Sequence, residues 1–215
     1  RTIENAIRMA RADALIHCAA MADVDACERD PESARRANTV LAACAAEAAQ
    51  RCSVHLIHIS TDAVFDGTAT LPYTEADTPN PVSVYARTKL EAEAAVLDAC
   101  PGAAVARVNF YGWSGTGKRS LAEFFVNNLS AGVRVRGFSD VTFCPMLVTD
   151  LCHVLLKMLE RGLAGLFHAV GPQPMSKYDF GVAIATIFGW DADLIQRTSV
   201  EAADLAAPRS HGLSL

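Results

Sequence analysis

Short apolar runs alternate along this chain with longer stretches whose apolar residues recur at helical spacing. The apolar runs, rich in Val, Ile and Leu, predict buried strands at 13–18, 53–59, 103–108 and 166–170, with a further short strand at 133–135. The periodic stretches predict helices at 1–11, 30–50, 83–99, 120–131, 150–160 and 176–189. Because strands joined by helices of this length form mostly parallel sheets, the pattern predicts an α/β fold with helices on both faces.

Helix-end signals support these boundaries. Asp30 can cap a helix that has Pro31 at its first position. Ser176 and Asp179 have the spacing of a capping box, and Gly162 and Gly189 are placed to end helices.

Composition excludes several classes of protein. The 215 residues are 51% hydrophobic and 20% charged, and the net charge of −5 is spread without a basic stripe. Neither nucleic acid nor an anionic membrane is therefore expected as a partner. Seven cysteines without a Cys-x-x-Cys pair, no signal-peptide pattern and no long apolar run predict a protein of the reducing cytoplasm.

In a parallel sheet, ligands bind at the carboxyl ends of the strands. Here those ends are Cys18, Ile59 and Val108, and polar or small residues follow each of them. We therefore expect the functional site at this edge of the sheet.

Tyr85 and Lys89 form the sharpest constellation near that edge. Four residues apart on a helix, a phenol and an ammonium share one face. A nearby cation favours phenolate, so the spacing predicts a lowered Tyr85 pKa suited to proton transfer. A solvent-exposed pair on an amphipathic helix is the alternative.

Hydroxyl and carboxyl groups follow the strand that precedes this helix. Ser60, Thr61 and Asp62 stand where a hydroxyl can donate to a carbonyl oxygen, or where they simply cap the strand. Ala19 and Ala20, after the first strand, leave room for a flat ring or a ribose. His55 and His58 alternate with apolar residues in a strand, so we predict core or surface histidines and no metal site.

Together these phrases resemble the extended short-chain dehydrogenase/reductase superfamily and, within it, the dTDP-4-dehydrorhamnose reductase branch. The resemblance rests on Leu15-Ile-His-Cys-Ala-Ala20, Ile59-Ser-Thr-Asp-Ala-Val-Phe-Asp-Gly67, Tyr85-Ala-Arg-Thr-Lys-Leu-Glu91 and Arg107-Val-Asn-Phe-Tyr-Gly112. Phe167-His168 and Met175-Ser-Lys-Tyr178 also resemble the regulatory beta subunit of methionine adenosyltransferase.

The resemblance implies a Rossmann-like, doubly wound sheet and transfer of hydride from NADPH or NADH to the C4 ketone of a nucleotide-linked deoxysugar. It implies that Tyr85 donates the proton, Lys89 binds the nicotinamide ribose and lowers the Tyr85 pKa, and Thr61 hydrogen-bonds the carbonyl. The residues expected beside the cofactor are Cys18, Ala19, Ala20, Met21, Ser60, Tyr85 and Lys89. Those expected beside the sugar are Thr61, Asp62, Val64, Phe65 and Phe110.

Residues 1–132 are expected to form the remainder of the dinucleotide-binding domain, and 133–215 mainly a smaller substrate-binding part whose segments interleave with the sheet. The family begins with a glycine-rich turn that binds pyrophosphate, whereas the first glycine here is Gly67. We therefore expect about 50 to 60 residues of the family pattern upstream of this chain. The residue that distinguishes NADPH from NADH falls in that segment, so both cofactors stay open.

Three departures concern the sugar. Ala63 stands where the family often has Tyr, Phe110 where it often has Trp, and 140–146 replaces a more polar phrase. Trp113 could supply the aromatic surface instead. Two alternatives stay open beside the reductase: a nucleotide-sugar epimerase or dehydratase, and a non-catalytic NAD(P)-binding regulatory subunit. A nucleotide sugar is the expected partner, and a homodimer is left open.

Overall fold

Four parallel strands form the central sheet of the computed structural model, which describes residues 2–117, 120–203 and 205–215. Their order across the sheet is β1 (Ala14–His17), β2 (His55–Thr61), β3 (Ala104–Val108) and β8 (Gly165–Ala169). Each neighbouring pair is parallel and in continuous register. The predicted α/β fold with a Rossmann-like parallel sheet is confirmed.

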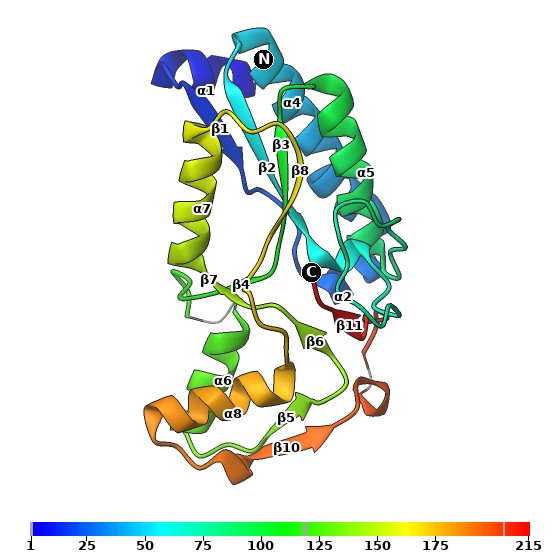
Figure 1. Ribbon diagram of the computed structural model, residues 1–215, viewed down its shortest axis with the longest axis vertical. Coiled ribbons are helices and arrows are strands. Elements are labelled where there is room, and N and C mark those ends of the chain that lie inside the picture. Colours follow the sequence, from blue (N-terminus) through cyan, green and yellow to red (C-terminus); the bar gives the residue numbers. More distant parts are fainter. Residues whose placement is uncertain (1, 118–119, 204) are drawn as a thin grey trace.

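Helices cover both faces of this sheet (Figure 1). On one face, α4 (Leu41–Cys52) and α5 (Val84–Ala99) bury small apolar side chains against Leu56 and Val105. On the other face, α7 (Val148–Glu160) packs on Ile57 and Ala106. Alanine is frequent in the first of these interfaces because a short side chain lets a helix lie close to a sheet.

Further helical segments surround these layers. α1 (Thr2–Ala10) contacts α4, and α2 (Val24–Arg29) and α3 (Pro31–Arg35) contact α5. A π-helical turn, η1 (Arg36–Val40), joins α3 to α4 without a break. Short 3-10 turns are η2 (Asp62–Val64), η3 (Ala192–Leu194) and η4 (Val200–Ala202).

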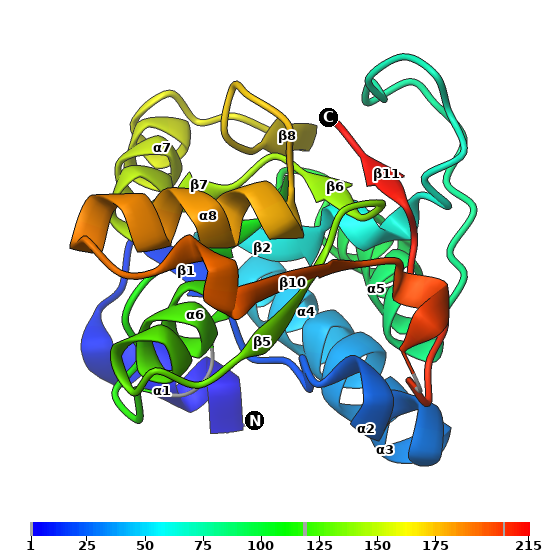
Figure 2. The ribbon, with the colours of Figure 1, turned by 90° about the horizontal axis from the view of Figure 1, so that it is seen from below.

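A smaller assembly lies beyond the carboxyl ends of the strands, at the bottom of Figure 1 and nearest the viewer in Figure 2. It contains α6 (Leu121–Ser130), α8 (Lys177–Phe188) and the parallel pair β5 (Val135–Phe138) and β10 (Ile195–Thr198). Its apolar side chains form a second core around Phe125 and Phe180. The remaining strands are two-residue pairings: β4 (Phe110–Tyr111), β6 (Thr142–Phe143), β7 (Met146–Leu147), β9 (Met175–Ser176) and β11 (Gly212–Leu213).

The sequence placed the long elements well. Asp30 accepts a hydrogen bond from the Ser33 amide, and Ser176 caps α8 by the same kind of contact, as predicted. Gly189 ends α8 in the left-handed region, with φ of 70°. Of the helix predicted at 1–11, residue 1 lies outside the described residues. The two-residue strands and α2 were not predicted, because so few residues carry no periodic signal.

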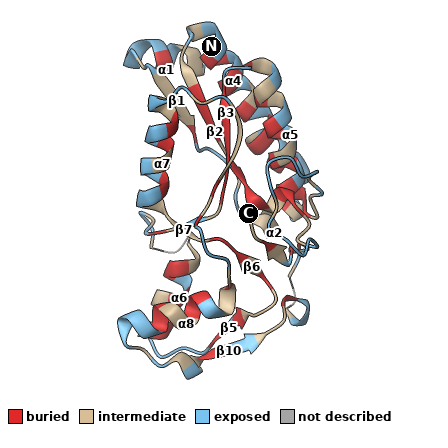
Figure 3. Cartoon of the chain, viewed as in Figure 1, coloured by how far each residue is buried: buried red, intermediate tan, exposed pale blue. Residues whose placement is uncertain are grey.

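Buried residues lie mainly between the sheet and its covering helices (Figure 3). The middle strand β3 is buried along its whole length, whereas the outward faces of α1, α7 and α8 are exposed. All seven cysteines lie within the described residues and are free thiols. Over the described ranges, we find no helix with the length and apolar character needed to span a membrane.

Candidate functional site

Two cavities meet at the carboxyl edge of the sheet. The first, here called the Lys89 cavity, has a volume of about 220 Å³ and the following lining: Cys18, Ala20, Ala22, Ile59, Ser60, Thr61, Asp62, Tyr85, Lys89, Val108, Asn109 and Phe110. The second, the Lys177 cavity, has about 200 Å³; besides Lys177 and Arg209 it is lined by residues such as Val141, Phe143 and Ser210. Thr61, Asp62, Tyr85 and Asn109 line both cavities. These shared residues define the point where the two cavities join.

Tyr85 reaches this junction from the first turn of α5. Ser83 caps the helix by accepting from the Ala86 amide, and Glu28 accepts from the Val84 amide, so the start of α5 is fixed from two sides. Burial raises the pKa of Tyr85 to about 12, and a hydrogen bond with Thr61 opposes that rise. The lowered pKa predicted from the Tyr85–Lys89 spacing is wrong for this arrangement, because burial of the phenol dominates.

Lys89 lies one helical turn further along α5 and is buried. Its Nζ donates to the carbonyl oxygen of Ile59 at 2.6 Å and lies 3.2 Å from Nε2 of His58. Burial lowers the pKa of Lys89 to about 8, although the carboxylate of Glu93 works in the opposite direction. The amine therefore lines the cavity while being held from behind by β2.

Asp62 is a buried carboxyl group at the same junction. Asn109 donates to its Oδ2 at 2.6 Å, and the Thr61 hydroxyl donates to its Oδ1 at 3.2 Å. Burial raises the pKa of Asp62 to about 6, against the lowering effect of these two hydrogen bonds. The carboxyl group can thus exchange a proton close to neutral pH.

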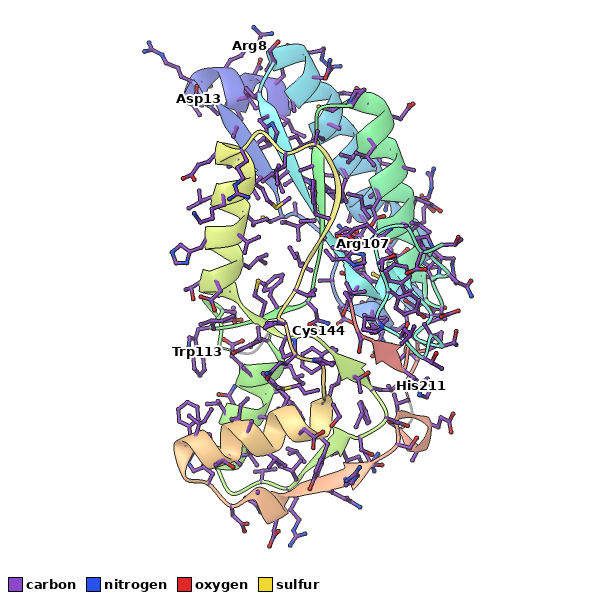
Figure 4. The ribbon with its side chains drawn as sticks, in the orientation of Figure 1. Arg8, Asp13, Arg107, Trp113, Cys144 and His211 are labelled. Atoms are coloured by element: carbon purple, nitrogen blue, oxygen red, sulfur yellow. The ribbon has the colours of Figure 1, made fainter. Side chains whose placement is uncertain are left out.

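A buried ion pair supports the site from below. Arg107 on β3 donates from Nε and Nη2 to Glu93 on α5 at 3.0 and 2.7 Å, and the Ser60 hydroxyl donates to Glu93 at 2.5 Å. Arg107 also lies over the Phe65 ring. Figure 4 shows Arg107 inside the layered part of the molecule. This network fixes α5, and with it Tyr85 and Lys89, against β2 and β3.

Five of the residues predicted beside a cofactor line the Lys89 cavity: Cys18, Ala20, Ser60, Tyr85 and Lys89. Ala19 and Met21 do not line it. The backbone of Met21 is instead held by Asn38, whose amide accepts from Met21 N and donates to Met21 O. The Met21 side chain packs in a small core cluster next to Tyr85.

The residues predicted beside the sugar fall into two groups, one that lines the cavities and one that is buried away from them. Thr61 and Asp62 line both cavities, and Phe110 lines the Lys89 cavity. Val64 and Phe65 are fully buried in a core cluster with Leu213 and line neither cavity. The turn η2 directs these two side chains under the loop and away from the strand end.

Trp113 does not replace an aromatic residue at this junction. It is 65% exposed and borders a separate apolar groove between α6 and α8. In Figure 4 it lies on the outer side of the molecule, away from Arg107.

Sequence reasoning gave no site role to Asn109 and Lys177, which line the cavities, or to His17 and His58, which lie behind Lys89. His17 ends β1 and pairs with His58 inside β2, whereas Asn109 directly follows β3 and contacts Asp62, so the register of these strands sets their positions. Asn109 comes directly after a predicted strand, a signal that could have identified it.

The sequence is similar to a known protein family and to several curated proteins. The family model for the RmlD substrate binding domain matches residues 1–215. The chain is 37% identical over 204 residues to dTDP-4-dehydrorhamnose reductase of Mycobacterium tuberculosis, which covers 92% of this chain. It is 33% identical over 211 residues to methionine adenosyltransferase 2 subunit beta of Danio rerio, which covers 94%. The chain spans 66% and 64% of the length of these two relatives.

The fold is also similar to solved structures of dTDP-4-dehydrorhamnose reductases. A dTDP-4-dehydrorhamnose reductase from Clostridium acetobutylicum superposes with a TM-score of 0.90 at 30% identity, over 97% of this chain and 73% of that one. The reductase from Bacillus anthracis, in complex with NADP, superposes with a TM-score of 0.92 at 24% identity, over 98% of this chain and 74% of that one, and shows the shared fold. The chain belongs to the RmlD substrate binding domain family.

Proposed function

We propose that this chain carries the reaction centre of an NAD(P)H-dependent reductase of a nucleotide-activated 4-keto-6-deoxy sugar. The observation that carries the proposal is the junction of two cavities, where Thr61 and Tyr85 stand between a buried ammonium on one side and further cations on the other. Similarity to the reductase of M. tuberculosis supports the same reading.

The Lys89 cavity fits the nicotinamide end of a dinucleotide. Its wall after β1 consists of Cys18, Ala20 and Ala22, whose small side chains let a flat ring approach the backbone. An ammonium carries three N–H donors, and two of the Lys89 donors are engaged by β2, which leaves one for a ribose hydroxyl. When bound, the cofactor supplies hydride. The NADP complex of the B. anthracis relative favours NADPH, with NADH as the alternative.

The residues at the junction bind and protonate the ketone oxygen. Thr61 donates a hydrogen bond to the carbonyl oxygen in place of its bond to Asp62. Tyr85 gives its phenolic proton to the same oxygen as negative charge develops there. The protonated Lys89 lines the same cavity as Tyr85, and its positive charge stabilises the phenolate that is left behind.

The Lys177 cavity fits the charged arm of a nucleotide sugar. Lys177 is the first residue of α8 and lines the cavity together with Arg209. Arg209 also donates a hydrogen bond to Asp25 at 2.9 Å. The described residues give the Lys177 amine no hydrogen bond or ion pair, and burial lowers its pKa. An anionic group would satisfy it. On this proposal the cofactor lies on the 1–132 part and the sugar extends over the 133–215 part.

The test is consumption of NADPH, and separately NADH, by the purified full-length protein with dTDP-4-dehydro-6-deoxy-L-mannose. Tyr85→Phe should lower kcat/KM by a factor of about 10² or more, equivalent to about 2.7 kcal/mol of barrier. Tyr111→Phe is the matched control, since this phenol lines the apolar groove instead. Turnover that survives Tyr85→Phe undiminished would refute the role of Tyr85.

A second candidate is a non-catalytic dinucleotide-binding subunit. The similarity to methionine adenosyltransferase 2 subunit beta favours it. Dinucleotide binding without turnover of any 4-keto sugar nucleotide would select this candidate. The remaining alternative is an epimerase or a dehydratase. Interconversion of sugar isomers without net cofactor consumption would indicate the epimerase, and loss of water from the sugar would indicate the dehydratase.

A further inference from the structure

Two buried histidines stand directly behind Lys89. His17 ends β1, and His58 lies beside it in register on β2. Their rings are stacked with centroids 5.2 Å apart, and both are less than a tenth exposed. Leu15 and Leu56, two residues earlier on each strand, pack toward α4 and α5, so both imidazoles face the same side of the sheet as Lys89.

A chain of nitrogen contacts joins the three side chains. Nδ1 of His17 lies 3.0 Å from Nδ1 of His58, and Nε2 of His58 lies 3.2 Å from Nζ of Lys89. An ammonium only donates, so Nε2 of His58 has to be the acceptor. The single ring proton of a neutral His58 is then on Nδ1 and is donated to Nδ1 of His17.

The remaining proton position follows from the same argument. His17 accepts at Nδ1, so its own ring proton is on Nε2, an atom that is buried without a partner among the described residues. Burial and the Lys89 charge lower the pKa of both histidines, that of His58 to about 2. Both rings are thus neutral at pH 7, as the acceptor role of His58 requires.

We propose that His58, with its tautomer set by His17, is the positioning residue that holds the Lys89 ammonium and leaves one N–H for the Lys89 cavity. Ile59 O takes one proton of the ammonium and His58 takes the second. The inference rests on the proposed function for its consequence in turnover, whereas the tautomer itself can be observed without any substrate.

The protonation of Lys89 depends on the groups that face it from every packed element. These are Glu93 and Tyr85 from α5, His58 from β2, His17 and Cys18 from the end of β1, Asp62 after β2, and Arg107 from β3, which is paired with Glu93. His58 is the neutral acceptor of this set and stabilises the ammonium by a hydrogen bond to a charged donor. Such a bond corresponds to a shift of about one pKa unit.

The first test is nitrogen-15 NMR of the six histidines in the full-length protein, at a pH about two units below the Lys89 pKa of about 8. His58→Gln assigns the signal. The expected result is a neutral His58 protonated at Nδ1. A proton on Nε2 would overturn the proposal, because Lys89 could then not be the donor.

The second test measures the Lys89 pKa and the pH profile of turnover in two variants. His58→Leu should lower the Lys89 pKa by about one unit and move the alkaline limb of kcat to lower pH, with little change in KM for the sugar. His58→Gln keeps an amide oxygen for Lys89 and an N–H for His17, so it should restore both values. His153→Gln, an exposed histidine on α7, is the control.

The outcomes separate the two proposals. An unchanged Lys89 pKa in a folded His58→Leu variant would overturn the positioning role. If that variant does not fold, the wild-type tautomer decides. If the expected tautomer is observed in a protein that turns over no sugar, the proposed function is refuted and the proposed arrangement of His17, His58 and Lys89 still holds.

Discussion

The buried pair of Glu93 and Arg107 gives a quantitative test of how the site is held together. Both residues are about 3% exposed, and Arg107 donates three hydrogen bonds to the Glu93 carboxylate. Glu93→Leu replaces the carboxylate by an apolar side chain of similar size, so the Arg107 guanidinium stays buried without its counter-charge. Removing one partner of a buried pair costs about 3–5 kcal/mol. For a chain of this size, that corresponds to a fall in Tm of roughly 6 to 20 °C.

The assay is urea unfolding followed by circular dichroism, with thermal unfolding as a second measurement. The double variant Glu93→Leu/Arg107→Met removes both charges and should recover most of the loss, since an apolar pair of similar volume avoids the desolvation cost. Glu47→Ala breaks an exposed pair with Arg51 and should cost less than about 1 kcal/mol.

Two results would refute the reasoning. A loss below about 1 kcal/mol in Glu93→Leu would mean that the pair contributes no more than a surface contact. A double variant as unstable as the single one would show that the unpaired charge is not the cause of the loss.

Two further predictions concern the junction and its packing. Burial raises the pKa of Asp62 from its ordinary value of 3.8 to about 6. Between these two values the folded protein keeps a proton on Asp62 that the unfolded chain releases, so the free energy of unfolding falls as the pH rises from about 4 to 6. Asp62→Asn should remove that fall and stabilise the protein at pH 7 by up to about 3 kcal/mol, measured by urea unfolding across pH; an unchanged pH dependence would contradict it. Gly171→Ala would place a Cβ 2.0 Å from the carbonyl oxygen of Pro145 and should cost about 1–3 kcal/mol, whereas Gly102→Ala meets nothing within 4 Å and should be nearly neutral in the same assay.

Much of the fold could be predicted because the long elements have strong periodicity. β1, β2, β3 and β8 are short apolar runs, and α5 and α7 carry continuous helical patterns. The strand-end rule also placed Thr61 and Asp62 at the carboxyl edge of the sheet, where they line the Lys89 cavity. What it could not supply was the direction of each side chain after the strand ends. The turn η2 sends Val64 and Phe65 into the core.

The histidines show a different limit. Within one strand, His58 is a polar residue between apolar neighbours, which is typical of a core position. Its partners are 41 and 31 residues away along the chain, at His17 and Lys89. Only the register between β1 and β2, and the packing of α5 over them, turns three separate residues into one hydrogen-bonded chain. Local patterns do not encode this information.

The shared lining of the two cavities separates chemistry from specificity. Thr61, Asp62, Tyr85 and Asn109 belong to both cavities, so in the proposed reaction the sheet and α5 would fix the position of the reacting oxygen. The outer wall of the Lys177 cavity comes instead from residues 141–143, α8 and the segment around Arg209, and residues 140–146 are one of the three departures from the family pattern. Exchanging these outer residues should therefore change which sugar nucleotide is accepted while leaving the protonation chemistry at Tyr85 in place.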